Sequence, residues 1–265
     1  MARLHRREGD TLTVVDNSPE PTGGPAGRDG ARVLRAAEVH TSYYARNRGA
    51  AAGDAEWILF LDADVEPAPD LIDGYFDPPP KTGVGVLAGG VRDEPAAPES
   101  RPSLAERFAA LRRPMDQANT MRPGPWTYAQ TANCAVRREA FEAVDGFTEA
   151  ARSGGDADLC FRVRDAGWSL QSRERAGVVH RNRTTLRSLL RQRARHGAGA
   201  AWLNQAYPGA FPPNRSPGVV WWSAQEAART LRAIAGRDRD AAVLHGVRVA
   251  WFWAFELGRL FPNHS

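Results

Sequence analysis

The sequence predicts an α/β protein with a mostly parallel sheet and flanking helices. Short apolar runs typical of buried strands alternate with helical patterns along the chain, which is the order expected of a parallel sheet covered by helices. Two of these runs, "TLTVVD" and "WILFLDAD", end in aspartates. Such sheets bind ligands at the carboxyl ends of their strands, so the acids predict a binding site there. The 265 residues suffice for one large domain or for one domain with an appendage.

The first half of the chain predicts strands separated by helices. The strand that ends in Asp16 is followed by a loop rich in glycine and proline that runs through Gly30. The proline and the acids of "PAPDLIDGYFD" suit the first turn of a helix. The predicted elements are a strand at 11–18, a strand or helix at 31–37, a helix at 41–55, a strand at 57–61, a helix at 67–77 and a strand at 84–91.

The second half predicts more helices and strands and then a C-terminal helical segment. The elements are a helix at 103–118, a strand at 126–138 with a break near Thr131, helices at 138–147 and 156–168, one or two strands at 169–180, and a long helix at 184–206. The segment 211–218 contains three prolines and predicts a linker. We therefore expect one domain at 1–210 and a C-terminal helical segment at 211–265.

Composition and charge restrict the classes of partner. The net charge is +4, which suits a phosphate-bearing ligand or an anionic membrane surface without requiring either. No nucleic-acid-binding motif is present, so we expect no nucleic-acid partner. Cys134 and Cys160 give neither a disulfide framework nor a zinc spacing, which favours a reduced, cytoplasmic setting. The sequence shows no secretory signal and no run of about 20 apolar residues that would predict a transmembrane helix.

The spacing of Asp62 and Asp64 predicts a metal site at the end of the strand at 57–61. In an extended chain, alternate side chains point to the same side, so both carboxylates could reach one point. Two neighbouring anions repel unless a cation lies near them. Mg²⁺ and Mn²⁺ take carboxylate oxygens and keep positions open for substrate phosphates. The alternative is a helix N-cap followed by a solvated loop acid, since aspartate is also favoured in such turns.

Five segments in order carry a resemblance to a known family. They are "VVDNS", "ARNRGAAAG", "WILFLDADVEP", "NCAVRREAFEAVDGF" and "GGDADLCFRVRDAGW". Together they resemble the family 2 glycosyltransferases, which have the GT-A fold, over roughly residues 11–205. The later run "RQRARHGAGAAWLNQAYPGAFPP" is similar to actinobacterial members near the mycofactocin-type glycosyltransferases.

The resemblance implies a GT-A-like, Rossmann-type sheet and an enzyme that is inverting and metal-dependent. Such an enzyme moves a sugar from a nucleotide-diphosphate sugar of the UDP or GDP type to the hydroxyl of a sugar, lipid or small-molecule acceptor, with Mn²⁺ or Mg²⁺ as cofactor. Asp16 would then contact the nucleotide base, and Arg46 and Asn47 would form part of the nucleotide pocket. Asp62 would lie near the ribose and the metal, and Asp64 would bind the metal.

The resemblance also implies a catalytic base and residues that contact the diphosphate. Asp156 matches the aspartate that accepts the acceptor's proton, although it could be only a helix N-cap, and Asp158 is the alternative base. His180 matches a position that helps bind metal or diphosphate in some relatives, although a hydrogen-bonded histidine at a strand end is equally common. Gln192 and Arg195 would correspond to a distal basic segment of the family.

Two departures from the family pattern leave other functions open. Relatives have a further strand ahead of the one at 11–18, so we expect an incomplete sheet there, through a start assigned too late, a rearranged fold or an inactive protein. Gly155 stands where the family commonly has glutamate. The alternatives to an active transferase are a catalytically inactive nucleotide-sugar-binding or partner subunit, and a nucleotidyltransferase, although no glycine-rich basic loop is visible near the first strand.

The C-terminal third carries two features with open interpretations. Arg183, Arg187, Arg191 and Arg195 recur every four residues, which on a helix draws one cationic stripe that either binds phosphates or is simply solvated. The apolar helix at 241–261 either packs on the domain or makes peripheral membrane contact on the cytoplasmic face.

Overall fold

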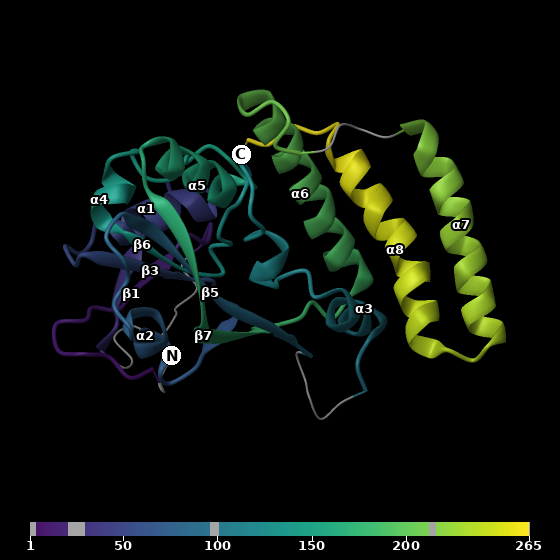
Figure 1. Ribbon diagram of the computed structural model, residues 1–265, viewed down its shortest axis with the longest axis horizontal. Coiled ribbons are helices and arrows are strands. Elements are labelled where there is room, and N and C mark those ends of the chain that lie inside the picture. Colours follow the sequence, from purple (N-terminus) through teal and green to yellow (C-terminus); the bar gives the residue numbers. More distant parts are fainter. Residues whose placement is uncertain (1–3, 21–29, 96–100, 212–215, 265) are drawn as a thin grey trace. The chain divides into compact units, whose positions relative to one another are not determined.

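The computed structural model describes residues 4–20, 30–95, 101–211 and 216–264 and divides the chain into two compact units (Figure 1). Unit 1 comprises Met1–Arg92, Met115–His180 and His264–Ser265, and unit 2 comprises Asp93–Pro114 and Arg181–Asn263. Unit 2 therefore also includes residues 93–114 and the predicted helix at 184–206, which the sequence assigned to the first domain. Part of the predicted linker, 212–215, and most of the glycine-rich loop, 21–29, lie outside the described residues.

Unit 1 contains two sheets. The larger sheet has five strands in the order β3 (Trp57–Leu61), β6 (Asn133–Arg137), β5 (Val84–Glu94), β7 (Ser169–Arg181) and β4 (Val65–Pro67). The smaller sheet consists of β1 (Thr13–Asp16) and β2 (Arg32–Arg35). In these sheets, β1 and β3 are both edge strands.

The α/β class is confirmed, but the prediction of mostly parallel strands is wrong. β1 pairs with β2 in parallel, whereas β3 with β6, β5 with β6, and β4 with β7 are antiparallel. Because β6 comes late in the chain and inserts between β3 and β5, the alternation of strands and helices along the sequence does not give their direction. The three-residue strand β4 is too short for a periodicity to predict.

The helices of unit 1 begin at residues that suit helix starts. Thr41 caps α1 (Ser42–Ala50), its side chain accepting a hydrogen bond from the backbone N–H of Tyr44 at 3.1 Å. Gly154, with φ of 84°, precedes α5 (Gly155–Asp165) and tolerates this left-handed conformation because it lacks a Cβ. The other helices are α2 (Leu71–Phe76), η2 (Gln117–Asn119) and α4 (Arg138–Glu142).

The core of unit 1 lies on the inner strands of the large sheet. Leu87 of β5, Ala135 of β6 and Ala176 of β7 are fully buried, and Leu71 and Tyr75 of α2 pack against them. Cys134 and Cys160 are buried free thiols.

Unit 2 is a helical assembly of α3 (Leu104–Arg112), α6 (Leu186–Ala206), α7 (Ser216–Ala235) and α8 (Arg239–Gly258). Two glycines let α6 and α8 approach closely, because a Cβ on Gly197 would lie 2.0 Å from the Phe255 carbonyl and one on Gly258 would lie 2.0 Å from the Ala194 carbonyl. Val243 and Val247 of α8 are buried against α3 and α6. Among the described helices, none is long and apolar enough to cross a membrane.

Candidate functional site

The carboxyl end of β3 carries an acid paired with an arginine from α1. The strand continues into Asp62, whose backbone N–H donates to the Ala132 carbonyl at 3.3 Å. The guanidinium of Arg46 donates to the Asp62 carboxylate. Arg46 also lies over the rings of Tyr43 and Phe147, 5.4 and 5.9 Å from their centroids, and such stacking is favourable for a planar cation. Arg46, predicted for the nucleotide pocket, and Asp62, predicted for the metal site, therefore form an ion pair.

Asp156 joins this pair electrostatically from the first turn of α5. It is half-buried, and its Oδ1 accepts a hydrogen bond from the N–H of Ala157 at 3.1 Å. Burial raises the pKa of the Asp156 carboxyl, the charge of Arg46 opposes this change, and the charge of Asp62 adds to it. Arg46 thus stands in the field of two carboxylates that are 94 residues apart in the sequence.

The glycine that departs from the family pattern has a structural cause. A Cβ on Gly155 would lie 2.8 Å from ring carbons of Tyr43, which is closer than real Cβ contacts allow. The Tyr43 ring also carries the stacked guanidinium of Arg46. The absence of an acidic side chain at position 155 therefore makes room for the ring that supports Arg46.

Asp64 faces a different partner from Asp62. Its carboxylate lies 3.6 Å from Nε2 of His180, because Val65 of β4 is paired in register with His180 of β7. The Asp64 side chain is half exposed, whereas that of His180 is buried. The chain turns between the two acids, with the N–H of Val65 donating to the Asp62 carbonyl at 3.3 Å, so the alternation expected of an extended chain does not apply.

The donor set at Asp64 suits a cation that keeps open positions. Mg²⁺ in proteins is usually held by one or two carboxylates together with substrate phosphates and waters, and imidazole is a further ligand for transition metals. Among the described residues, no group of three or more His, Cys, Asp or Glu side chains could hold a metal on its own. The Asp64 carboxylate and the His180 imidazole would therefore supply only part of a coordination shell.

Asp16 and Asn47, predicted to contact the nucleotide, form hydrogen bonds or ion pairs with neighbouring segments of the chain. The Asp16 carboxylate lies 2.9 Å from the guanidinium of Arg35 on β2 and accepts from the N–H of Ser18 at 3.0 Å. Asn47 donates to the Phe147 carbonyl and accepts from the Phe147 N–H, both at 2.9 Å. Asp16 thus joins β1 to β2, and Asn47 joins α1 to the loop that carries Phe147.

The alternative base, Asp158, is buried and bound on several sides. Its Oδ2 accepts from the hydroxyl of Thr148 at 2.8 Å and from Nη2 of Arg162 at 2.7 Å. Arg162 in turn donates to the Val144 and Gly146 carbonyls. This network fixes α5 to the loop before it, which gives Asp158 a structural role and leaves Asp156 as the carboxylate beside Arg46.

Gln192 and Arg195 belong to unit 2, on α6. Gln192 Oε1 accepts from Nε of Arg183 at 3.0 Å. Arg183 precedes the first residue of α6, so the cationic stripe on the helix itself consists of Arg187, Arg191 and Arg195, all exposed.

A buried asparagine in β6 was not among the predicted residues. Asn133 is fully buried, and its Nδ2 donates to the Gly90 and Ala176 carbonyls at 2.9 and 2.7 Å, while its Oδ1 accepts from the hydroxyl of Tyr75 at 2.7 Å. It is the register partner of Leu61, the residue before Asp62. A polar residue within the apolar run "TANCAV" was the signal in the sequence that could have identified it.

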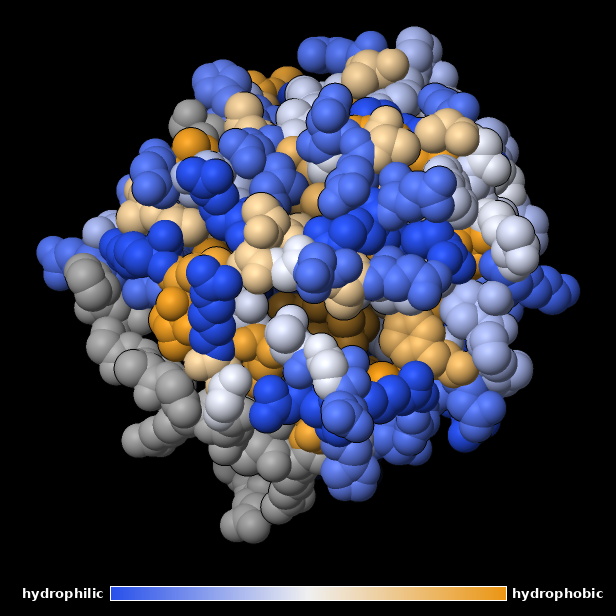
Figure 2. Space-filling view, turned by 90° about the vertical axis from the view of Figure 1, so that its left-hand side faces the viewer, coloured by the Kyte–Doolittle hydropathy of each residue, from blue (hydrophilic) through white to orange (hydrophobic). Residues whose placement is uncertain are grey.

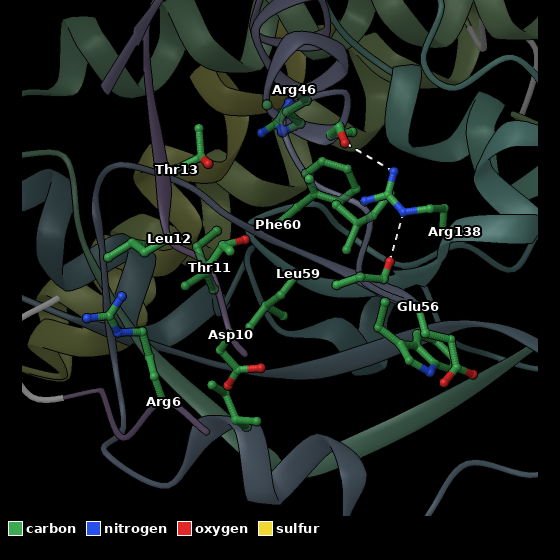
Figure 3. A pocket seen from close by; sticks show the side chains of 18 of the residues that line it. Arg6, Asp10, Thr11, Leu12, Thr13, Arg46, Glu56, Leu59, Phe60 and Arg138 are labelled. Carbon is green, nitrogen blue, oxygen red and sulfur yellow. Dashed lines mark hydrogen bonds between the residues drawn. The ribbon is translucent and has the colours of Figure 1, made fainter. Parts of the chain in front are cut away.

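A cavity of about 900 Å³ in unit 1 reaches from the N-terminal segment to Arg46 and Asp62. Figure 3 shows its walls, with Thr11, Leu12 and Thr13 on one side, Leu59 and Phe60 on another, and Arg46 at one end. Figure 2 shows this side of unit 1 hollowed near its centre, with hydrophobic residues in the hollow and hydrophilic ones around it. The cavity therefore combines an apolar interior with charged groups at its ends.

Solved structures share the fold, and this defines the class. Mannosyltransferase PcManGT from Pyrobaculum calidifontis, in complex with GDP-Man and Mn²⁺, has a TM-score of 0.61 at 17% identity, covering 95% of this chain and 78% of that chain. Glucosyl-3-phosphoglycerate synthase from Mycobacterium tuberculosis, in complex with Mn²⁺, UDP-Glc and phosphoglyceric acid, has a TM-score of 0.51 at 22% identity, covering 78% and 70%. The fold is that of the GT-A glycosyltransferases, as the sequence predicted.

The family follows from sequence. The profile of glycosyl transferase family 2 matches residues 10–145, and the chain belongs to that family. It is 32% identical over 216 residues to the pre-mycofactocin glycosyltransferase of Mycobacterium tuberculosis, covering 78% of this chain and 44% of the relative. Glycosyltransferase AglE of Haloferax volcanii is 30% identical over 166 residues, covering 60% and 52%. The chain thus spans about half the length of the curated relatives it matches.

Proposed function

We propose that this chain transfers a sugar from a nucleotide-diphosphate sugar to an acceptor hydroxyl by a single displacement that inverts the anomeric centre. The observation that carries the proposal is Asp156, a half-buried carboxylate with a raised pKa at the start of α5, in the field of Arg46 and Asp62. A general base works best when its pKa approaches the working pH. Membership of glycosyl transferase family 2 supports the reaction class.

Each described side chain has a distinct task in this proposal. Asp156 accepts the proton of the acceptor hydroxyl as the oxygen attacks. Arg46 holds Asp62 in place through their ion pair and keeps a positive charge beside both carboxylates. The half-exposed carboxylate of Asp64 and the imidazole of His180 would hold a divalent cation, Mn²⁺ or Mg²⁺. Such a cation, when bound, stabilises negative charge on the leaving diphosphate.

The test measures hydrolysis and transfer from UDP-glucose and GDP-mannose by the purified protein, with Mn²⁺, with Mg²⁺ and with EDTA. We expect release of the nucleotide diphosphate with either metal and none with EDTA. Asp156→Asn should lower kcat by a factor on the order of 10²–10⁴, the usual contribution of a general base, while leaving the affinity for the donor near that of the wild type. Asp64→Asn and His180→Gln should weaken Mn²⁺ binding measured by titration calorimetry.

Asp165→Asn is the matched control, because Asp165 lies exposed at the opposite end of the same helix. It should leave turnover and metal affinity unchanged. Undiminished turnover by Asp156→Asn would remove its role as the base. If the wild-type chain binds the donor but turns over none of the acceptors tested, it is better described as a nucleotide-sugar-binding subunit. If it releases pyrophosphate from a nucleoside triphosphate, it is better described as a nucleotidyltransferase.

A further inference from the structure

The first turn of α5, which carries Asp156, begins without a side-chain cap of its own. The residue before the helix is Gly154, which has no side chain to accept a hydrogen bond. The backbone bond from Asp158 N–H to the Gly154 carbonyl, at 3.0 Å, opens the helical ladder. The N–H groups ahead of that bond have no partner inside a helix. Those of residues 155–157 therefore need other acceptors, and these acceptors determine where Asp156 stands.

Two side chains supply the acceptors. Ala157 N–H donates to Oδ1 of Asp156 at 3.1 Å. Hydrogen bonds from the N–H groups of Gly155 and Asp156 act on the hydroxyl of Tyr43, which belongs to α1. A side-chain oxygen that accepts such N–H groups stabilises a helix start. Tyr43 therefore caps α5 from a helix that lies far earlier in the sequence.

The ring of Tyr43 packs against the backbone of the same turn. α1 and α5 lie side by side (Figure 1), and a Cβ on Gly155 would lie 2.8 Å from ring carbons of Tyr43. The ring of Phe147 stacks on that of Tyr43, with the centroids 5.4 Å apart. Tyr43 is only 5% exposed. Turning the ring away from α5 would break both contacts, so the hydroxyl has a fixed position.

The same ring supports the guanidinium of Arg46. The Cζ atom of Arg46 lies 5.4 Å from the ring centroid of Tyr43, and a cation over an aromatic face is attracted to it. Arg46 also forms the ion pair with Asp62. One tyrosine thus contacts both the helix start that carries Asp156 and the arginine that binds Asp62.

The hydroxyl of Tyr43 stays neutral while Asp156 ionises. Burial raises the pKa of the hydroxyl and the charge of Asp156 raises it further, whereas Arg46 and the two N–H groups oppose the change. The net result is a pKa above the ordinary value for tyrosine. Tyr43 therefore holds its neighbours in place and leaves acceptance of the proton to Asp156.

We propose that Tyr43 is a positioning residue that joins the two charged parts of the candidate site. Its hydroxyl holds the first turn of α5, and with it the carboxylate of Asp156, while its ring holds the guanidinium of Arg46. The inference rests on the proposed role of Asp156 as the base. Such positioning matters because a misplacement of about 1 Å can lower a rate by a factor on the order of 10².

The first test compares Tyr43→Phe with Tyr44→Phe. Tyr43→Phe keeps the ring and removes the hydroxyl, so we expect kcat to fall by a factor of roughly 10 to 10², while the Kd of UDP and of GDP with Mn²⁺ stays near that of the wild type. Tyr44 is the matched control, since it is also buried and its hydroxyl bonds to Glu38 at 2.8 Å and to Arg48 at 3.1 Å. Tyr44→Phe should change neither constant.

The pH profile separates positioning from a general loss of structure. Without the hydroxyl, water reaches the Asp156 carboxylate and the two released N–H groups can turn towards it; both changes favour the ionised form. The acid limb of kcat/KM should therefore move to lower pH in Tyr43→Phe. Partial unfolding would lower the plateau without moving the limb.

The other groups that act on Asp156 are unchanged in this variant. They are the charges of Arg46 on α1 and of Asp62 after β3, and the buried thiols of Cys134 on β6 and Cys160 on α5. A shift of the limb in Tyr43→Phe therefore reports the loss of the hydroxyl.

Amide hydrogen exchange provides a readout that needs no turnover. In Tyr43→Phe, exchange of the Gly155 and Asp156 amides should accelerate by about tenfold or more, because the loss of a hydrogen bond exposes an amide to water. In Tyr44→Phe, both amides should exchange as in the wild type. Circular dichroism establishes that each variant folds.

Gly155→Ala tests the ring from the opposite side. The added methyl group would displace the ring of Tyr43 and with it the guanidinium of Arg46, so we expect both a lower kcat and weaker binding of UDP and GDP. Tyr43→Phe, which keeps the ring, should lower kcat alone. Gly177→Ala is the control, because the nearest atom to a Cβ there lies 4.0 Å away.

Three results would overturn the proposal. They are a wild-type kcat in Tyr43→Phe, equal losses in Tyr43→Phe and Tyr44→Phe, and unchanged exchange of the Gly155 and Asp156 amides. Failure of the proposed function looks different, since Asp156→Asn would then keep full turnover or the wild type would transfer no sugar. In that case amide exchange still decides whether Tyr43 holds the start of α5.

Discussion

Replacing Asn133 by alanine should destabilise unit 1 more than any surface substitution. The side chain makes three hydrogen bonds within the sheet core, to the Gly90 and Ala176 carbonyls and from the Tyr75 hydroxyl. It is fully buried, so its removal takes a hydrogen-bond partner from three polar groups inside the sheet. Each such group costs about 1–2 kcal/mol, the lower part of the range for a buried unpaired group, which gives a loss of roughly 3–6 kcal/mol. The fit is tight, because a Cβ on Gly89 would lie 2.3 Å from both Asn133 Nδ2 and the Tyr75 hydroxyl.

The assay is urea unfolding followed by Trp fluorescence, with thermal melts as a second measure. A loss of 3–6 kcal/mol corresponds to a fall in Tm of roughly 6–24 °C for a protein of this size. Tyr75→Phe removes one donor and should cost about 1–2 kcal/mol. In the double variant the two losses should not add, because the shared hydrogen bond is counted once. Thr82→Ala, at an exposed turn, is the control and should stay within about 0.5 kcal/mol.

The reasoning fails if Asn133→Ala loses less than about 1 kcal/mol, or if its effect and that of Tyr75→Phe add fully. Either result would mean that water or a rearranged neighbour satisfies the freed groups. Activity provides a second readout, since Asn133 is paired with Leu61 in register. The variant should also lose turnover if the end of β3 must be held in place for Asp62 to act.

Two further predictions concern pH. The base must be ionised to work, so kcat/KM should fall as the pH drops through the pKa of Asp156. Because that pKa is raised, we expect the fall at a pH above the usual carboxyl range. A fall only at or below pH 4 would contradict this. Burial and the neighbouring Arg193, Arg195 and Arg183 lower the pKa of His196 to about 3. The folded state therefore holds His196 neutral, and the stability this gives is complete above the unfolded pKa of 6.5 and is lost as pH falls towards 3. The free energy of unfolding, measured by urea titration, should drop by roughly 1–2 kcal/mol between pH 7 and pH 5, and His196→Gln should flatten that dependence.

The elements that the sequence predicted well are those with long or sharply bounded patterns. The strand at 57–61 agrees with β3 residue for residue, and the helix at 184–206 agrees with α6 apart from its first two residues. The ambiguous segment at 31–37 became β2 because parallel pairing with β1 decided between two equal local preferences. Strand direction could not be predicted, since it depends on where β6 inserts, and no local pattern encodes that position.

The sequence named candidate site residues but not their arrangement. Arg46 forms an ion pair with Asp62 and lies in the electrostatic field of Asp156. The pairing of Asp64 with His180 depends on β4, a strand of three residues that follows a turn. The expectation that Asp62 and Asp64 point to the same side assumed an extended chain and therefore missed this turn. The stack of Arg46 on Phe147 joins residues 101 positions apart and has no local signal.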